Sequence, residues 1–119
     1  MKFLVMDDSG TMRKIITLAL KTRGYEVLEA ENGVDGLAKI KETKVDFMLV
    51  DINMPEMNGL EFIREAKKIP QYGFTPILVL TTEAEAEMKQ EALSLGAKAY
   101  LIKPFQKDNL LETIDKIMS

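Results

Sequence analysis

The chain of 119 residues is 46% hydrophobic and carries a net charge of −3, so it can bury one core and lacks the broad positive charge of a nucleic-acid-binding protein. It contains no cysteine and no histidine, which excludes the usual zinc sites and nucleophile systems built on either residue, and leaves only metals that prefer oxygen ligands. No apolar run approaches the roughly 20 residues of a membrane span, and we find no signal peptide or cysteine that indicates an oxidising compartment, so we expect a cytoplasmic protein that contacts no membrane.

Five apolar segments alternate with five amphipathic segments along the chain. The amphipathic segments repeat apolar residues at helical spacing, and we expect Gly24 to cap the first of them in the left-handed conformation. The predicted elements are a strand at 2–6, a helix at 11–23, a strand at 25–30, a helix from 34 to about 44, a strand at 45–51, a helix at 60–69, a strand at 77–80, a helix at 84–95, a strand at 99–102 and a helix whose apolar face spans 110–118.

The strand at 45–51, with the sequence VDFMLVD, is predicted to be the centre of the fold. Its apolar residues are too continuous for a strand with one face in water, so we expect it to be buried on both sides of a parallel sheet. It ends in Asp51, and turn residues follow at once. The strand at 25–30 alternates only in part, so we expect it at an edge of the sheet.

Alternating strands and helices, joined by right-handed crossovers, predict a parallel sheet with helices on both faces. For five units the common solution is the flavodoxin-like doubly wound (βα)5 fold of the α/β class, a parallel five-stranded sheet with strand order 2-1-3-4-5, and we expect residues 1–119 to form one such domain. The first and third strands are neighbours in that order. The acids that follow them, Asp7, Asp8 and Asp51, are therefore predicted to meet at one crevice.

Carboxylates that meet at one crevice repel one another. Two unit charges 4 Å apart cost about 4 kcal/mol at an effective dielectric constant of 20, so the cluster predicts a bound cation. Mg2+ is the best candidate because the ligands are oxygen atoms, and Mn2+ is the alternative. Thr81 and Lys103 follow the fourth and fifth strands and supply a hydroxyl and an ammonium group, which with a metal can cradle phosphoryl oxygens. Asp51 is the predicted nucleophile, because the central strand places it between the acid pair and these two groups.

Each of these residues also has an ordinary structural interpretation. The acids can cap the helices that follow them, as can Thr81, and Lys103 can be a solvated surface lysine. A functional site is favoured because all of these residues stand at the carboxyl ends of four different predicted strands.

Five motifs accompany the predicted strands in chain order: LVMDDS, AENGVDGL, DFMLVDINMPEMNGLE, PILVLTTE and GAKAYLIKPF. Together they resemble the receiver domain of bacterial two-component response regulators, and most closely its stand-alone CheY-like kind. The resemblance covers essentially all 119 residues. The strand order 2-1-3-4-5 is already known for CheY, so the resemblance implies it as well.

The resemblance assigns a role to each residue of the crevice. It implies that Asp51 is the phosphoacceptor, that Asp7 and Asp8 are the acid pair that holds Mg2+, and that Asn53 gives the metal its backbone carbonyl. It also implies that Lys103 contacts the phosphoryl group. The protein would then catalyse its own phosphotransfer and slow self-dephosphorylation without being a dedicated enzyme.

The resemblance also implies a switch. Thr81 is the implied switch hydroxyl, Tyr100 is the switch aromatic on the edge strand, and a cis peptide bond is implied before Pro104. The family usually has alanine or glycine where this chain has Thr82, which leaves open which of the two threonines is the switch; we prefer Thr81 because it closes the apolar strand. Three residues are implied to tune access to the phosphoryl group: Asn53, Thr82 and Glu83.

The absence of histidine means that the chain cannot be its own phosphohistidine donor. The resemblance implies a sensor histidine kinase or phosphotransfer domain as the donor. We expect no output domain after Ser119 unless the sequence was cut from a longer chain. The expected output is therefore contact with another protein through the face formed by the helix at 84–95, the strand at 99–102 and the last helix. We expect no binding to nucleic acid or membrane, and a monomer or a weak phosphorylation-dependent dimer.

Three other functions fit the fold less well. A magnesium-dependent phosphohydrolase would carry its nucleophile after the first strand and a cap domain, whereas no insertion here exceeds a loop. An FMN-binding electron carrier needs a Ser/Thr/Gly-rich phosphate loop where this chain has two aspartates. A degenerate receiver that serves as a scaffold would lack some of the acidic, hydroxyl or lysine residues, and all are present.

Overall fold

The computed structural model describes residues 1–52, 57–82 and 86–119. It contains a parallel five-stranded sheet with strand order β2-β1-β3-β4-β5, which confirms the predicted fold class and order. The strands are β1 (Lys2–Met6), β2 (Glu26–Ala30), β3 (Phe47–Asp51), β4 (Ile77–Thr81) and β5 (Ala99–Ile102). The helices are α1 (Gly10–Lys21), α2 (Gly33–Glu42), α3 (Gly59–Lys67), α4 (Ala86–Ser94) and α5 (Lys107–Met118), with a short 3-10 helix, η1 (Pro70–Tyr72).

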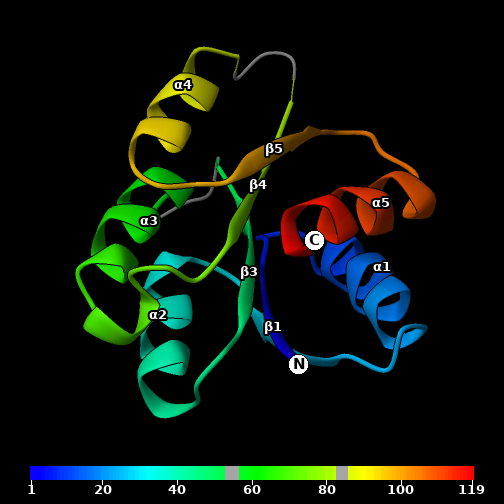
Figure 1. The fold of residues 1–119 in the computed structure, drawn as a ribbon, viewed down its shortest axis with the longest axis horizontal. Helices are drawn as coiled ribbons and strands as arrows, with labels where there is room; N and C mark the ends of the chain where they lie inside the picture. The colour runs from blue at the N-terminus through cyan, green and yellow to red at the C-terminus, as the bar shows by residue number, and fades with distance from the viewer. Residues whose placement is uncertain (53–56, 83–85) are drawn as a thin grey trace.

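Helices cover both faces of the sheet, α1 and α5 on one and α2, α3 and α4 on the other (Figure 1). Each face has its own apolar core, and the sheet separates the two cores. Every residue of β3 and β4 is buried, while the edge strands β2 and β5 are partly exposed. The predicted central strand and the predicted edge strand at 25–30 are thus confirmed. No helix in the described ranges is long and apolar enough to cross a membrane.

Local sequence signals set the ends of the helices. The side chains of Ser9, Asn32 and Asn58 each accept a backbone hydrogen bond at the start of α1, α2 and α3. Such caps satisfy amide groups that have no partner inside the helix. Gly24 has a φ of 77° just after α1, as predicted, and Gly96 has a φ of 117° just after α4. These glycines turn the chain toward β2 and β5.

The region between α3 and β4 differs from the prediction. The helix predicted at 60–69 ends at Lys67, and a separate 3-10 turn begins at Pro70. That turn buries Tyr72 completely. The Tyr72 hydroxyl donates to the carbonyl of Ile40 at 2.5 Å and lies 3.4 Å from the amide nitrogen of Val45, which donates to it. Tyr72 therefore fixes the path from α2 into the central strand, and no local sequence pattern around Tyr72 indicates this role.

Candidate functional site

Three carboxylates converge at the carboxyl end of the sheet. Asp7 directly follows β1 and Asp51 ends β3, and these strands are paired with Met6 opposite Val50. One carboxylate oxygen from each of Asp7, Asp8 and Asp51 lies within 4.8 Å of the other two. Asp7 is fully buried and Asp51 is 4% exposed, whereas Asp8 is open to water. The predicted meeting of these acids is therefore observed.

Lys103 also contacts this cluster, and it directly follows the edge strand β5. Its Nζ lies 3.0 Å from Oδ2 of Asp7 and 3.4 Å from Oδ2 of Asp51. Burial opposes the charged form of Lys103, but the hydrogen bond to Asp7 and the charges of Asp51 and Asp7 outweigh burial, so the pKa of Lys103 is raised. Its backbone amide donates to the carbonyl of Thr81, and the Lys103–Pro104 peptide is cis, as the resemblance implies. Lys103 is not the solvated surface lysine of the alternative interpretation.

Backbone contacts hold Asp7 in place. Its Oδ1 accepts from the amide of Ser9 at 2.9 Å, and its own amide donates to the carbonyl of Ala30 at 3.1 Å. Arg13 donates from Nη1 to the Asp7 carbonyl at 2.5 Å and from Nε to Glu29 at 3.2 Å. Arg13 was not among the residues predicted from the sequence, and its position one turn into α1 is the only signal that could have indicated it. Ser9, and neither aspartate, is the N-cap of α1.

Asp51 is positioned by the start of α3. Gly59 lies so close to β3 that a Cβ built there would be 2.4 Å from the carbonyl oxygen of Asp51, so only glycine fits. The Gly59 amide also donates to the carbonyl of Ile52 at 2.9 Å. Asn58 and Glu61 form a capping box at this helix end. The carboxylate of Asp51 thus projects from backbone that is held on the sheet and at the helix.

Of the two predicted switch residues, Thr81 ends the strand next to β3 and Tyr100 lies on the edge strand β5. Thr81 ends β4 and is fully buried, and its hydroxyl donates to the carbonyl of Thr82 at 3.2 Å. Because α4 begins at Ala86, Thr81 is too far away to be its N-cap. Tyr100 on β5 is 40% exposed, and Nζ of Lys89 on α4 lies 4.8 Å from its ring centre. Asn53 and Glu83 fall outside the described residues.

The donor set of the acid cluster suits Mg2+ or Mn2+. Both ions favour carboxylate and other oxygen ligands, and each Mg2+–oxygen bond is about 2.1 Å long, so adjacent octahedral ligands stand about 3.0 Å apart and opposite ones about 4.2 Å apart. Three ligands include at least two adjacent pairs, and the three carboxylate oxygens lie within 4.8 Å of one another. Asp7, Asp8 and Asp51 therefore offer suitable oxygen ligands for a divalent cation, and direct binding by all three would require them to converge.

Comparison with known proteins agrees with this geometry. The family model of the response regulator receiver domain matches residues 3–115. The chain belongs to this family. The receiver is 41% identical over 122 aligned positions to the chemotaxis protein CheY1 of Helicobacter pylori, with 99% of this chain and 97% of that protein covered. It is also 41% identical to a chemotaxis protein CheY homolog of Campylobacter jejuni, with 99% of this chain and 92% of that protein covered.

The fold of this receiver is also that of a solved CheY structure. The chemotaxis response regulator CheY4 of Vibrio cholerae superposes with a TM-score of 0.92 at 42% identity, covering 98% of this chain and 97% of that one. The resemblance to a CheY-like receiver of a two-component system is therefore confirmed, and a CheY-like receiver is a signalling protein. The individual roles of the site residues remain predictions.

Proposed function

We propose that this receiver accepts a phosphoryl group on Asp51 from a histidine kinase or phosphotransfer domain and then changes the face it presents to an output protein. The observation that supports this most is the placement of Asp51. Its nearly buried carboxylate lies within the acid cluster and 3.4 Å from Lys103, where both a nucleophile and charge compensation are available.

In the proposed reaction, a carboxylate oxygen of Asp51 attacks the phosphorus of a phosphohistidine. The P–N bond breaks, a P–O bond forms, and the departing imidazole takes up a proton. Lys103 already contacts Asp51, so its ammonium group can follow the negative charge from the carboxylate to the phosphoryl oxygens. Asp7 and Asp8, with the backbone carbonyl of Asn53, would hold Mg2+ or Mn2+. That ion would neutralise charge on the phosphoryl oxygens.

The proposed output face comprises α4, β5 and α5. A phosphoryl group on Asp51 offers the Thr81 hydroxyl a stronger, charged acceptor than the carbonyl of Thr82. Movement of Thr81 would leave room for the Tyr100 ring to turn inward. The ring would then leave Lys89, whose contact is worth about 0.5–1 kcal/mol at an exposed site, so Lys89 favours the outward ring before phosphorylation.

This coupling predicts a specific loss in Thr81→Ala. The variant retains Asp51 and Lys103 and should still be phosphorylated, but Tyr100 and the amides of α4 should no longer respond. The measurement is an NMR comparison with and without the phosphate mimic beryllofluoride, with Thr82→Ala as the matched control. If beryllofluoride changed the NMR shifts of Tyr100 equally in Thr81→Ala and in the wild type, a residue other than Thr81 would couple Asp51 to Tyr100.

We propose the partners as classes of protein: a histidine kinase or phosphotransfer domain as the donor, and an output protein. The curated relatives are chemotaxis proteins, which supports chemotaxis as the pathway. We propose a monomer or a weak phosphorylation-dependent dimer, since contact with an output protein needs the α4-β5-α5 face to be free.

Thr82 is half-buried beside Thr81, where its β-branched side chain would narrow access to the phosphoryl group together with Asn53 and Glu83.

Chemical labelling tests the proposed phosphoacceptor directly. Incubation with acetyl phosphate and Mg2+ should add one labile acyl phosphate per chain. Borohydride converts an aspartyl phosphate into homoserine, so peptide mass spectrometry of the reduced protein should find homoserine at position 51 alone. Homoserine at another aspartate, or none under conditions that label a known CheY, would refute the assignment.

A further inference from the structure

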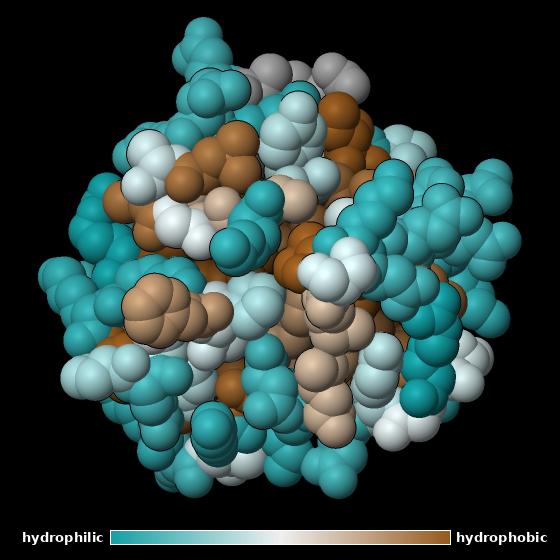
Figure 2. Space-filling view, in the orientation of Figure 1, coloured by the Kyte–Doolittle hydropathy of each residue, from teal (hydrophilic) through white to brown (hydrophobic). Residues whose placement is uncertain are grey.

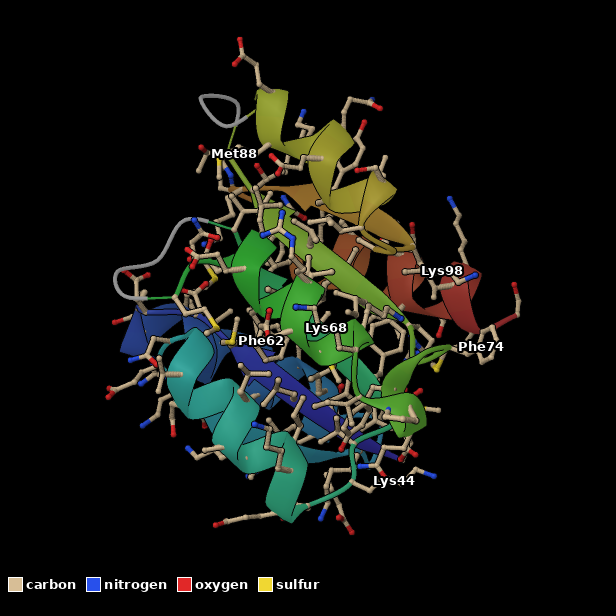
Figure 3. All side chains as sticks on the ribbon, turned by 90° about the vertical axis from the view of Figure 1, so that its left-hand side faces the viewer. Lys44, Phe62, Lys68, Phe74, Met88 and Lys98 are labelled. Atoms are coloured by element: carbon tan, nitrogen blue, oxygen red, sulfur yellow. The ribbon has the colours of Figure 1, made fainter. Side chains whose placement is uncertain are left out.

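Phe74 is the most exposed large apolar side chain in the described part of the chain, with 99% of its surface open to water. It lies between η1 and β4, at the amino end of the parallel sheet, whereas Asp51 lies at the carboxyl end. Figure 3 shows Phe74 and Lys98 projecting from the same edge of the molecule. Single exposed apolar residues are common, so the surroundings decide whether Phe74 has a role.

The loop that carries Phe74 is held on both sides of this residue. Nζ of Lys67 donates to three flanking backbone carbonyls, those of Tyr72, Gly73 and Thr75, at 3.3, 3.3 and 2.8 Å. Tyr72 is completely buried and anchors the start of the loop. The restrained backbone on both sides of Phe74 therefore keeps this residue at the surface, beside Lys67.

A hollow of about 300 Å3 lies beside the ring. Its described lining combines apolar surface with two ammonium groups and includes no acid: Lys67, Gly73, Phe74, Leu95, Gly96 and Lys98. Burial lowers the pKa of Lys67, and the nearby charge of Lys98 lowers it further. Lys98 is exposed and forms no ion pair within the described ranges. The hollow thus places the unpaired ammonium group of Lys98 next to an aromatic ring, while the ammonium group of Lys67 is bound by three backbone carbonyls.

We propose that this hollow docks a short acidic segment of a partner protein. An apolar residue of the segment would lie against Phe74, and a carboxylate would pair with the ammonium group of Lys98. Charge complementarity supports this occupant, because Lys98 has no ion pair within the described ranges and the charge of Lys67 lies nearby. Nucleic acid is disfavoured, since two lysines on a chain of net charge −3 form no basic stripe.

The location gives this contact a distinct consequence. Asp51 is at the opposite end of the sheet, so a partner docked at Phe74 leaves the acid cluster open. The receiver could be held near its donor or its target while the phosphoryl group is exchanged. The face viewed in Figure 2 is otherwise a mixture of small apolar patches and many hydrophilic groups, as expected of a surface that makes only local contacts.

NMR titration of the full 15N-labelled chain tests the proposal. The probes are a blocked hexapeptide Glu-Glu-Leu-Phe-Glu-Glu, its charge-reversed form with lysine in place of glutamate, and a thymidine hexanucleotide. The acidic peptide should produce saturable shifts confined to the amides around Gly73, Phe74, Gly96 and Lys98. The basic peptide and the hexanucleotide should bind at least about tenfold more weakly.

Variants separate this docking from other effects. Phe74→Ala and Lys98→Ala should each weaken binding of the acidic peptide about tenfold, while the exposed controls Leu18→Ala on α1 and Lys116→Ala on α5 should change it less than about twofold. Acetyl phosphate labelling should be equal in all four variants, so failure of docking is distinguishable from failure of phosphorylation. The proposal is overturned by shifts centred elsewhere, by equal or tighter binding of either other probe, or by a Phe74-dependent dimer in sedimentation.

Discussion

Asp51→Asn is expected to reduce phosphoryl incorporation from acetyl phosphate by about a hundredfold or more, because loss of a nucleophile is among the most severe changes a reactive site can suffer. An amide lacks the negative charge and the nucleophilic oxygen of the carboxylate. The fold should survive, since asparagine has nearly the same shape and the change removes one of three mutually repelling charges. Lys103 retains its contact with Asp7 at 3.0 Å.

Melting curves and labelling should be measured on the same samples of this variant. We expect a melting temperature equal to or above that of wild type, together with the loss of labelling. Asp115→Asn is a matched control, because Asp115 is an exposed carboxylate paired with Arg23 far from the acid cluster. Labelling of Asp51→Asn at the wild-type level would mean that another residue accepts the phosphoryl group.

Lys103→Met is expected to destabilise the metal-free protein by about 2–4 kcal/mol, and to lower its melting temperature by roughly 10 °C. Methionine keeps much of the length of the lysine stem but removes the charge that compensates Asp7 and Asp51. Asp7 is fully buried and Asp51 is 4% exposed, so neither carboxylate can recover its hydration. We place the loss below the largest values known for buried pairs because 18% of the Lys103 side chain reaches water.

Magnesium and a second substitution test this explanation. Mg2+ should raise the melting temperature of Lys103→Met more than that of wild type, because the ion replaces the missing positive charge. Adding Asp51→Asn to Lys103→Met should restore part of the stability, since one of the three clustered negative charges is removed. Lys116→Met controls for loss of an exposed lysine. If Lys103→Met melted at the wild-type temperature, the lysine would contribute nothing to holding the acids together.

Much of the site was predictable because its residues stand at strand ends. Asp7, Asp51, Thr81 and Lys103 each follow an apolar run, and a parallel sheet brings the carboxyl ends of such runs to one edge. The pairing of Lys103 with Asp7, 96 positions earlier in the chain, could not be derived from either local sequence. Strand order was needed to place them together, and side-chain packing decides the final contacts.

The parts that the sequence did not reveal depend on contacts between distant segments. The pattern that predicts a helix at 60–69 gives no indication of the 3-10 turn that Pro70 opens and that buries Tyr72. The partners of the Tyr72 hydroxyl lie 27 to 32 positions away, so no local pattern encodes them. Arg13 has an unremarkable place in its helix, and its importance comes only from the carbonyl of Asp7 that it reaches.

The hydrogen bond between Gly59 and Ile52 couples two parts of the fold mechanically. The amide of Gly59, the first residue of α3, is bound to the residue that directly follows Asp51, so the start of the helix rests on the end of β3. A substitution that displaces the start of α3 should therefore also displace the backbone that carries Asp51. Gly59→Ala is such a substitution, because its Cβ would meet the Asp51 carbonyl.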